Sequence, residues 1–192
     1  SPAADTLHQA VAHLQSGKLK RAEGLLARVL KKFPDHPDGL HYHGVVLYQQ
    51  GRYEESISQL TAAISSAPDY AEAHNSLCIV LLEKRNYDDA ISHAKRALEI
   101  RPGFVGALAN LGNAYQERGE PVRAIDSYRA ALALDPMHRE AAYRMASAHL
   151  VLNEAELAIA ACSACLRIDP YCQHALAYKA VALQLVGRNE EA

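Results

Sequence analysis

The chain has 192 residues and a formal net charge of −2 at neutral pH, with its ten histidines counted as neutral. Its residues are 49% apolar and 22% charged, a balance typical of a folded, water-soluble protein. A charge so near zero gives no reason to expect nucleic acid or a membrane surface as a partner. The longest apolar runs, such as residues 77–82, are far shorter than the roughly 20 residues that span a bilayer.

The spacing of apolar residues predicts helices along the whole chain. In residues 105–138, for example, Leu108, Leu111 and Tyr115 recur at i, i+3 and i+7, which places them on one helix face. In chain order we expect helices over residues 4–16, 18–32, 38–50, 53–66, 71–84, 87–100, 105–118, 121–134, 139–152, 155–168 and 173–186. The sequence therefore predicts an all-α fold.

The prolines show that these helices belong to a repeat. Five of the eight prolines are spaced by 34 residues, namely Pro34, Pro68, Pro102, Pro136 and Pro170. A fixed period of this length is typical of a solenoid built from pairs of helices. We expect a single array over residues 1–192, with units at about 3–36, 37–70, 71–104, 105–138 and 139–172 and a partial unit at 173–192.

Two columns of equivalent positions support the repeat. The position that ends the first helix of each unit holds Gly17, Gly51, Arg85, Gly119, Asn153 and Gly187. Glycine and asparagine there favour the left-handed conformation that terminates a helix. The eighth position of each unit is always small and holds Ala10, Gly44, Cys78, Gly112, Ala146 and Ala180. We expect the two helices of a unit to approach closely there, because a larger side chain would overpack the contact.

The best copy of the repeat is residues 105–138. It contains Leu108-x2-Leu111-Gly112-x2-Tyr115, then Ala124-x3-Tyr128, and then Pro136. This resembles the tetratricopeptide repeat signature, with Leu108 in place of the leading aromatic residue. The resemblance implies an all-α, right-handed superhelix (an α-solenoid) of helix-turn-helix units. It also implies a non-catalytic protein–protein interaction scaffold that binds an extended peptide or a partner helix in its concave groove.

The resemblance also implies which side chains face that groove, because the first helix of each pair lines it. The candidate peptide-binding residues are Tyr42, Tyr48, Asn75, Asn110, Asn113, Gln116, Tyr143, Arg144 and Tyr178. Amide side chains donate and accept hydrogen bonds, as a peptide backbone requires, and tyrosines are frequent hot spots of binding. Carboxylates at the same slots outnumber Arg144, so we expect a neutral or basic peptide. The family's carboxylate clamp needs two lysines that are absent here.

Other residue types suggest chemistry less strongly. Cys162, Cys165, Cys172 and His174 include the ligand types of a metal site, but Cys162 and Cys165 fall on core positions of a predicted helix. His41 and His43 point in different directions from one helix, and His74 occupies a core position filled by leucine in other units. We therefore expect packed cysteines and histidines, with no catalytic residue, no metal site and no cofactor.

The setting of the array leaves alternatives open. Four cysteines do not form the framework of a disulfide-rich protein, and no secretory signal opens the chain. We therefore expect a cytoplasmic location, with the periplasm as the alternative. The array is also similar to bacterial arrays that precede a glycosyltransferase, sulfotransferase or oxygenase domain. Leu183 and Val186 would lack a covering helix, so we expect either a further segment beyond Ala192 or self-association through this end.

Overall fold

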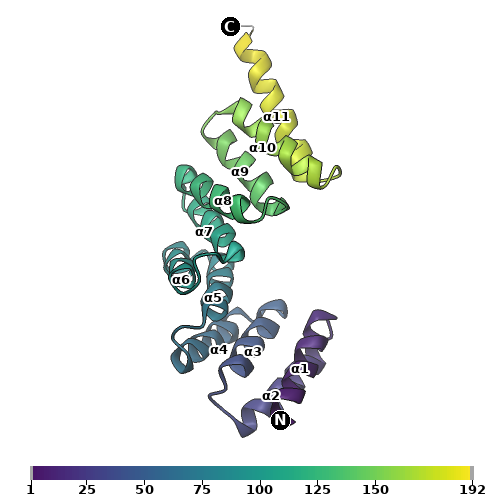
Figure 1. Cartoon of the computed structure of the whole chain (residues 1–192), viewed down its shortest axis with the longest axis vertical. Helices are drawn as coiled ribbons and strands as arrows, with labels where there is room; N and C mark the ends of the chain where they lie inside the picture. The colour runs from purple at the N-terminus through teal and green to yellow at the C-terminus, as the bar shows by residue number, and fades with distance from the viewer. Residues whose placement is uncertain (1, 191–192) are drawn as a thin grey trace. The chain divides into compact units, whose positions relative to one another are not determined.

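The computed structural model describes residues 2–190, with side chains for residues 4–187. Over this range the chain is helical, with short turns and no strand (Figure 1). The helices are α1 (Pro2–Gln15), α2 (Leu19–Lys32), α3 (Pro37–Gln49), α4 (Tyr53–Ser66), α5 (Ala71–Glu83), α6 (Tyr87–Ile100), α7 (Val105–Glu117), α8 (Pro121–Leu134), α9 (Arg139–Val151), α10 (Ala155–Ile168) and α11 (Gln173–Glu190). The predicted all-α class is confirmed, as is its organisation as a solenoid of repeated helix pairs.

The turns inside the repeats form as the sequence predicted. Gly17, Gly51 and Gly119 have positive φ angles of 70°, 76° and 88°. Arg85 and Asn153, which hold the same position, adopt φ angles of 57° and 59° although neither is glycine. After each turn, a backbone N–H returns to the helix that has just ended; that of Glu120, for example, donates to the Tyr115 carbonyl at 2.8 Å. These bonds satisfy carbonyls that the helix end would otherwise leave unpaired.

The prolines close the second helices for a different reason. The residue before each periodic proline is extended; Ala67, for example, has φ −142° and ψ 88°, and Asp135 has φ −131° and ψ 89°. A proline forces this conformation on its predecessor because its ring collides with a helical backbone. The period of 34 residues thus fixes where every second helix ends.

The last helix differs from the prediction. We expected it to end at residue 186, before a turn at Gly187, but α11 continues to Glu190. That prediction is wrong. At the other turns, a second helix follows and packs back on the first. No such helix follows α11 among the described residues, so nothing holds the chain in a turn at Gly187.

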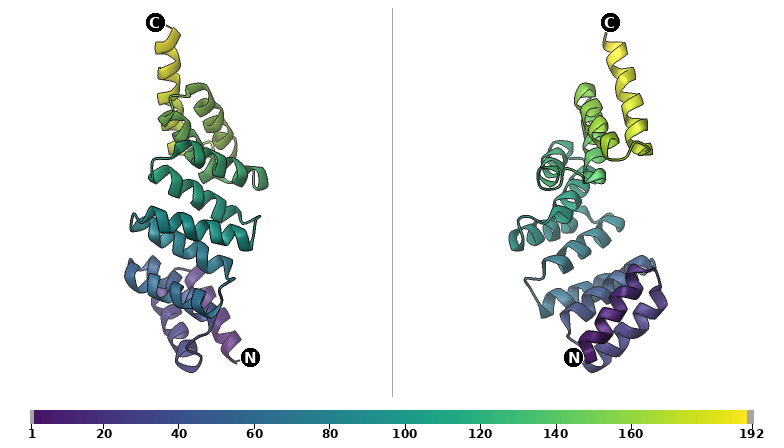
Figure 2. Two further views of the ribbon diagram at one scale, coloured as in Figure 1. Left: turned by 90° about the vertical axis from the view of Figure 1, so that its left-hand side faces the viewer. Right: turned by 45° about the vertical axis from the view of Figure 1, so that its right-hand side comes forward.

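The helices pack in antiparallel pairs, each first helix against the second helix that follows it (Figure 2). Contacts between residues group the chain into two compact units, residues 1–102 and 103–192. In the first unit, α2 packs on α3 and α4 on α5. In the second unit, α8 packs on α9 and α10 on α11. A single array over the whole chain therefore remains a prediction.

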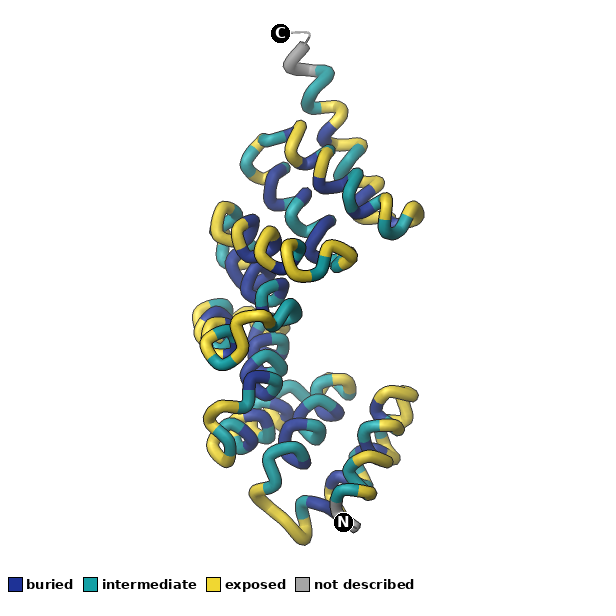
Figure 3. The backbone as a smooth tube through the Cα atoms, viewed as in Figure 1, coloured by how far each residue is buried: buried dark blue, intermediate teal, exposed yellow. Residues whose placement is uncertain are grey.

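Close approach inside the pairs explains the column of small residues. A Cβ atom added to Gly44 would lie 2.6 Å from Leu60 Cγ, and one added to Gly112 would lie 2.5 Å from Tyr128 Cε1. Both distances are far below van der Waals contact, so a larger residue there would displace the buried side chain of Leu60 or Tyr128. Ala10, Cys78 and Ala146 in the same column have no exposed surface. The buried side of each helix is dark blue in Figure 3.

The prediction for this column does not hold at the end of the chain. Ala180 is exposed, because no second helix covers it within the part of the chain that the structure describes. Leu183 is 53% exposed, as expected for a residue without a covering partner. The same expectation is wrong for Val186, which packs against a cluster of Ala155, Ala158 and Ala182.

Candidate functional site

Two groups of first helices carry the predicted binding residues. The N-terminal face consists of α3 and α5 in the first compact unit and carries Tyr42, Tyr48 and Asn75. The C-terminal face consists of α7, α9 and α11 in the second unit and carries Asn110, Asn113, Gln116, Tyr143, Arg144 and Tyr178. The predicted residues therefore fall into two sets, one in each compact unit.

The tyrosines of the N-terminal face are half-buried phenols. Tyr42 packs against the apolar cluster that α1 and α2 contribute to the first unit. Burial, followed by the charges of Asp38 and Glu72, raises the pKa of Tyr42. Tyr48 donates a hydrogen bond to Glu83 Oε1 at 3.4 Å, and burial raises its pKa as well. Both phenols therefore remain protonated near neutral pH and present a partly exposed ring.

A chain of hydrogen bonds joins α3 to α5 on the same face. The Tyr70 hydroxyl donates to Asp38 Oδ1 at 2.7 Å and lies 3.1 Å from His41 Nδ1. His41 Nε2 lies 2.9 Å from Ser76 Oγ. His41 is buried, and its burial lowers its pKa to about 4, so the imidazole is neutral at physiological pH. Asn75, next to Ser76 on α5, is half-buried.

This chain of contacts was not predicted from the sequence. There, His41 was rejected as half of a metal-binding pair with His43, and Tyr70 was not a candidate. One signal was present: His41 and Ser76 are 35 residues apart, as are Tyr48 and Glu83. Positions about one repeat apart lie side by side on neighbouring first helices. Complementary polar residues at that separation would have identified both pairs.

The C-terminal face contains a buried polar centre on α7. Asn113 is only 9% exposed. The Tyr128 hydroxyl reaches it from α8 and lies 2.8 Å from Asn113 Oδ1 and 3.0 Å from Gln116 Oε1. Gly112 makes this possible, because the ring of Tyr128 lies where a Cβ atom would be. Both amides are therefore held by the scaffold at their oxygen atoms.

The nitrogen atoms of the same amides point to α9. Asn113 Nδ2 lies 3.4 Å from Glu140 Oε1, and Gln116 Nε2 donates to Ser147 Oγ at 3.1 Å. Glu140 also forms an ion pair with Arg144, whose Nε lies 2.9 Å away. The structure thus brings Asn113, Gln116 and Arg144 into one network.

Aromatic side chains occupy the rest of the C-terminal face. The rings of Tyr143 and His174 are stacked, with centroids 4.7 Å apart and an interplanar angle of 14°. Tyr178 lies beyond His174, at 6.5 Å between centroids. Burial raises the pKa of Tyr143. Asn110 is half-buried on α7, one turn before Asn113.

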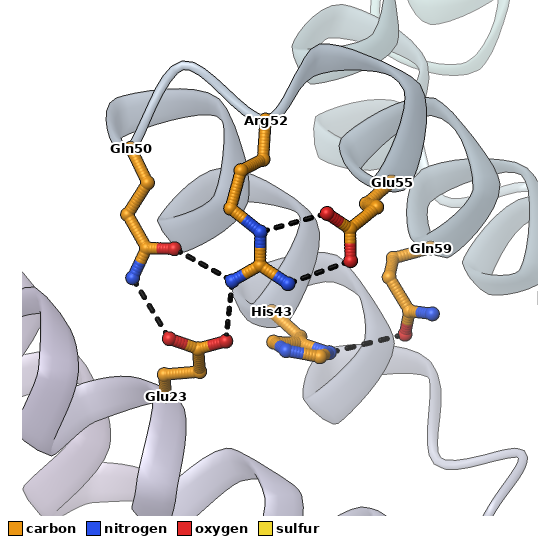
Figure 4. A network of polar contacts seen from close by, with 6 residues as sticks. All are labelled: Glu23, His43, Gln50, Arg52, Glu55 and Gln59. Carbon is orange, nitrogen blue, oxygen red and sulfur yellow. Dashed lines mark hydrogen bonds and ion pairs between the residues drawn. The ribbon is translucent and has the colours of Figure 1, made fainter.

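Another polar network in the first compact unit is structural (Figure 4). Arg52 pairs with Glu23 at 2.7 Å and with Glu55 at 2.6 Å, and Gln50 donates to Glu23 at 2.9 Å. Hydrogen bonds from Gln50 and then Arg52 lower the pKa of Glu23. His43 lies 3.2 Å from Gln59 beside this group. Arg52 bridges the two carboxylates, so this network joins α2 to the pair α3 and α4.

The remaining histidine and cysteine predictions concern packing. His74 is buried, with Nδ1 2.9 Å from His93 Nδ1 and Nε2 3.2 Å from the Pro68 carbonyl, so the expected packed histidine is confirmed. Cys162 and Cys165 are fully buried in an apolar cluster with Cys172, which confirms their core positions. Among the described residues, no group of three or more histidine, cysteine or acidic side chains could hold a metal ion.

Comparisons with known proteins agree with this architecture. The structure of TTC0263, a thermophilic TPR protein from Thermus thermophilus, matches with a TM-score of 0.77 and 21% identity, over 95% of this chain and 99% of that chain. YrrB, described as a TPR protein with an unusual peptide-binding site, matches with a TM-score of 0.74 and 20% identity, over 91% and 90%. MamA from Desulfovibrio magneticus RS-1 matches with a TM-score of 0.77 and 18% identity, over 89% and 97%. At these identities the likeness concerns the fold.

Sequence comparison gives the family. No curated protein matches the chain. In addition, no helix among the described residues is long and apolar enough to cross a membrane. A tetratricopeptide repeat model matches residues 7–60, 43–103 and 110–171, and a second one matches residues 81–126. These matches cover most of the chain, which therefore belongs to the tetratricopeptide repeat family.

Proposed function

We propose that this chain is a non-catalytic protein-interaction scaffold whose first-helix faces form a groove for an extended peptide or a partner helix. The observation that carries the proposal is that hydrogen bonds within the protein already hold polar side chains on those faces in place. Asn113 and Gln116 are held by Tyr128, and Tyr48 is held by Glu83. Side chains that are already ordered lose less conformational entropy when a ligand binds.

The C-terminal face has the composition of a binding hot spot. Tyr143 and Tyr178 present partly exposed rings beside His174. Aromatic rings of this kind bury a large apolar area while their hydroxyl groups stay hydrated. The half-buried amides of Asn110 and Gln116 supply hydrogen-bonding groups for a peptide backbone, with buried Asn113 between them. An extended peptide would thus find apolar and polar contacts on one face.

The N-terminal face supports a preference for neutral or basic peptides. Asp38, Glu72 and Glu83 lie beside its tyrosines, and the negative charges of the first two add to the effect of burial in raising the pKa of Tyr42. Complementary charge speeds association and selects among partners more than it adds affinity. Family membership supports the broader proposal of an interaction scaffold. The peptide-binding site ascribed to YrrB supports peptide recognition on this fold.

Mutation of the C-terminal face tests the proposal. We expect Tyr143→Ala to weaken capture of peptides from an immobilised decapeptide library by about tenfold or more, the effect of losing a hot-spot residue. Asn110→Ala should weaken binding of the same peptides without loss of helicity. Tyr171→Ala is the matched control, because Tyr171 is 86% exposed outside both faces. Equal binding by all three variants would place the peptide elsewhere and contradict the proposal.

A second proposal concerns the parent protein. The array would instead serve as the substrate-recognition arm of a glycosyltransferase, sulfotransferase or oxygenase. Exposed apolar side chains on α11, among them Leu176, Val181 and Leu183, favour a further packing partner at this end. The full reading frame decides the matter. A stop codon within about 40 residues of Ala192, roughly one repeat, would rule out a following catalytic domain.

A further inference from the structure

We infer that Ser76 acts as a one-way hydrogen-bond acceptor on the N-terminal face and selects N–H donors of the bound peptide. The inference rests on the proposed function and names a specificity residue for it. Its basis is the chain of contacts from Asp38 through Tyr70 and His41 to Ser76, which spans α3 and α5 within one compact unit.

The position of each proton in this chain is determined by its neighbours. Tyr70 has a single hydroxyl proton, and the contact with Asp38 at 2.7 Å uses it, because a carboxylate only accepts. Burial, with help from Asp38, also raises the pKa of Tyr70 far above neutrality, so the phenol keeps this proton. The contact at 3.1 Å between Tyr70 and His41 Nδ1 then requires a proton on Nδ1.

The same reasoning extends to Ser76. His41 is neutral at physiological pH, since burial lowers its pKa to about 4. A neutral imidazole with a proton on Nδ1 has none on Nε2. Nε2 therefore accepts, and the Ser76 hydroxyl, 2.9 Å away, must donate. A serine hydroxyl ordinarily donates or accepts as required, but here its only proton is already used.

Ser76 consequently offers only lone pairs to a ligand. A backbone N–H, an ammonium or a guanidinium group can bind there, whereas a carbonyl or carboxylate oxygen would meet another acceptor. The surrounding charge acts in the same direction, because Asp38 and Glu72 both exert a negative potential at His41. Ser76 is half-buried on α5, so part of its surface remains available.

The first test measures the tautomer of His41 and needs no ligand. We expect 15N NMR of the full chain at neutral pH to show a protonated Nδ1 and a bare Nε2 on His41. In Tyr70→Phe, the acceptor for Nδ1–H is lost, so the ring should revert to the Nε2–H form that free histidine prefers. A wild-type His41 that carries its proton on Nε2 would overturn the inference.

The second test uses labelled decapeptides of alternating lysine and alanine, with alternating glutamate and alanine for comparison, in fluorescence anisotropy. We expect wild-type protein to favour the lysine peptide. Loss of one hydrogen bond in Ser76→Ala should lower the affinity for that peptide by about threefold to tenfold. Ser92→Ala is the matched control, because Ser92 is exposed on α6 and donates to its own helix at Asp88.

Two further peptides identify the source of the N–H group. Backbone N-methylation removes the amide N–H and keeps the charge, while lysine acetylation removes the charge and keeps the amide. The form that no longer distinguishes wild type from Ser76→Ala has lost the group that Ser76 binds. Equal affinity of wild type and Ser76→Ala for the lysine peptide, or a preference for glutamate, would overturn the inference. If neither peptide binds wild-type protein, basic-peptide binding fails as a function, and the tautomer of His41 still decides how Ser76 is oriented.

Discussion

Gly112 links the packing of the repeat to the orientation of the polar residues on the C-terminal face. The ring of Tyr128 lies against this glycine, at 2.5 Å from the position of an added Cβ atom. From there the hydroxyl reaches Asn113 and Gln116. A residue chosen for close helix contact therefore also determines how two candidate binding amides point.

Replacement of Gly112 tests this link. We expect Gly112→Ala to lower the free energy of unfolding by about 1–3 kcal/mol, the usual cost of overpacking, as measured by urea denaturation. Gly24→Ala is the control: Gly24 is exposed within α2 and an added Cβ atom meets nothing. That change should instead stabilise the protein by about 0.5–1 kcal/mol, because alanine has a higher helix propensity than glycine. Equal effects of the two changes would show that Gly112 is not in tight contact.

Arg85 is the residue at which the repeat tolerates backbone strain. Its φ angle is 57°, in the left-handed region that its equivalents Gly51 and Gly119 adopt at no steric cost. That conformation costs a residue with a side chain about 1–2 kcal/mol of strain in the folded state. Glycine avoids the strain, but it lowers the stability of the protein by about 0.5–1 kcal/mol because it has more conformational freedom in the unfolded chain. We expect Arg85→Gly to stabilise the protein by about 0.5–1 kcal/mol. A lower melting temperature would mean that contacts of the Arg85 side chain outweigh the strain.

Helices α5 and α6 are joined by a contact that depends on proton occupancy. The ring centroids of His74 and His93 are 5.2 Å apart, with 2.9 Å between their Nδ1 atoms. One of these nitrogens must donate and the other accept, so the pair cannot carry a proton on both. Burial lowers the pKa of both rings, and their charged neighbours are Asp69 and Arg96 at His74 and Asp89 at His93.

Acid should therefore weaken the first compact unit. His41, His74 and His93 all have pKa values below the ordinary 6.5 because burial disfavours their charged forms. The unfolded chain then binds more protons than the folded one, so stability falls as pH drops below about 6.5. For His41 the loss continues to about pH 4.

Urea denaturation between pH 7.5 and pH 5 measures this effect. We expect the free energy of unfolding to decrease across that interval, and the double change His74→Leu and His93→Leu to make the decrease smaller, because leucine does not titrate. Leucine is the natural choice, since Leu40 and Leu108 hold the position of His74 in other units. Stability that rises toward pH 5 in wild-type protein would contradict the assignment of neutral, buried rings.

The helices could be predicted from the sequence because the residues that end a helix recur every 34 residues. The periodic prolines and the turn position fixed all helix ends to within two residues except the end of α11, where no partner helix follows among the described residues. The side-chain networks were harder to predict. The contacts of Tyr70 with Asp38 and His41 join residues 32 and 29 positions apart, and helical periodicity describes only neighbours on one helix.

For the molecule as a whole, the two faces differ in chemistry. The N-terminal face presents acceptors, with Ser76 fixed by His41 and with Asp38 and Glu72 beside it. The C-terminal face carries the stacked rings of Tyr143 and His174 and a network in which Asn113, Gln116 and Arg144 are already paired. The two faces would therefore offer different groups to the ligand proposed above.

Exposed apolar side chains gather on α11. Leu176, Val181 and Leu183 are 48%, 47% and 53% exposed, and exposed apolar surface favours association. We propose self-association through this surface. Sedimentation velocity over a dilution series should show a larger species that Leu183→Glu removes, with unchanged helicity. Wild-type protein that stays monomeric at every concentration would contradict this proposal.

The four cysteines have a practical consequence. Cys78, Cys162, Cys165 and Cys172 are all buried, and burial raises the pKa of Cys78 and Cys165 to about 12. Thiol reagents attack the thiolate, which Cys78 and Cys165 scarcely form in the folded state, and burial shields all four thiols from a reagent. A cysteine placed on either face would therefore be labelled selectively by a maleimide dye, and its fluorescence would report ligand arrival without removal of any native thiol.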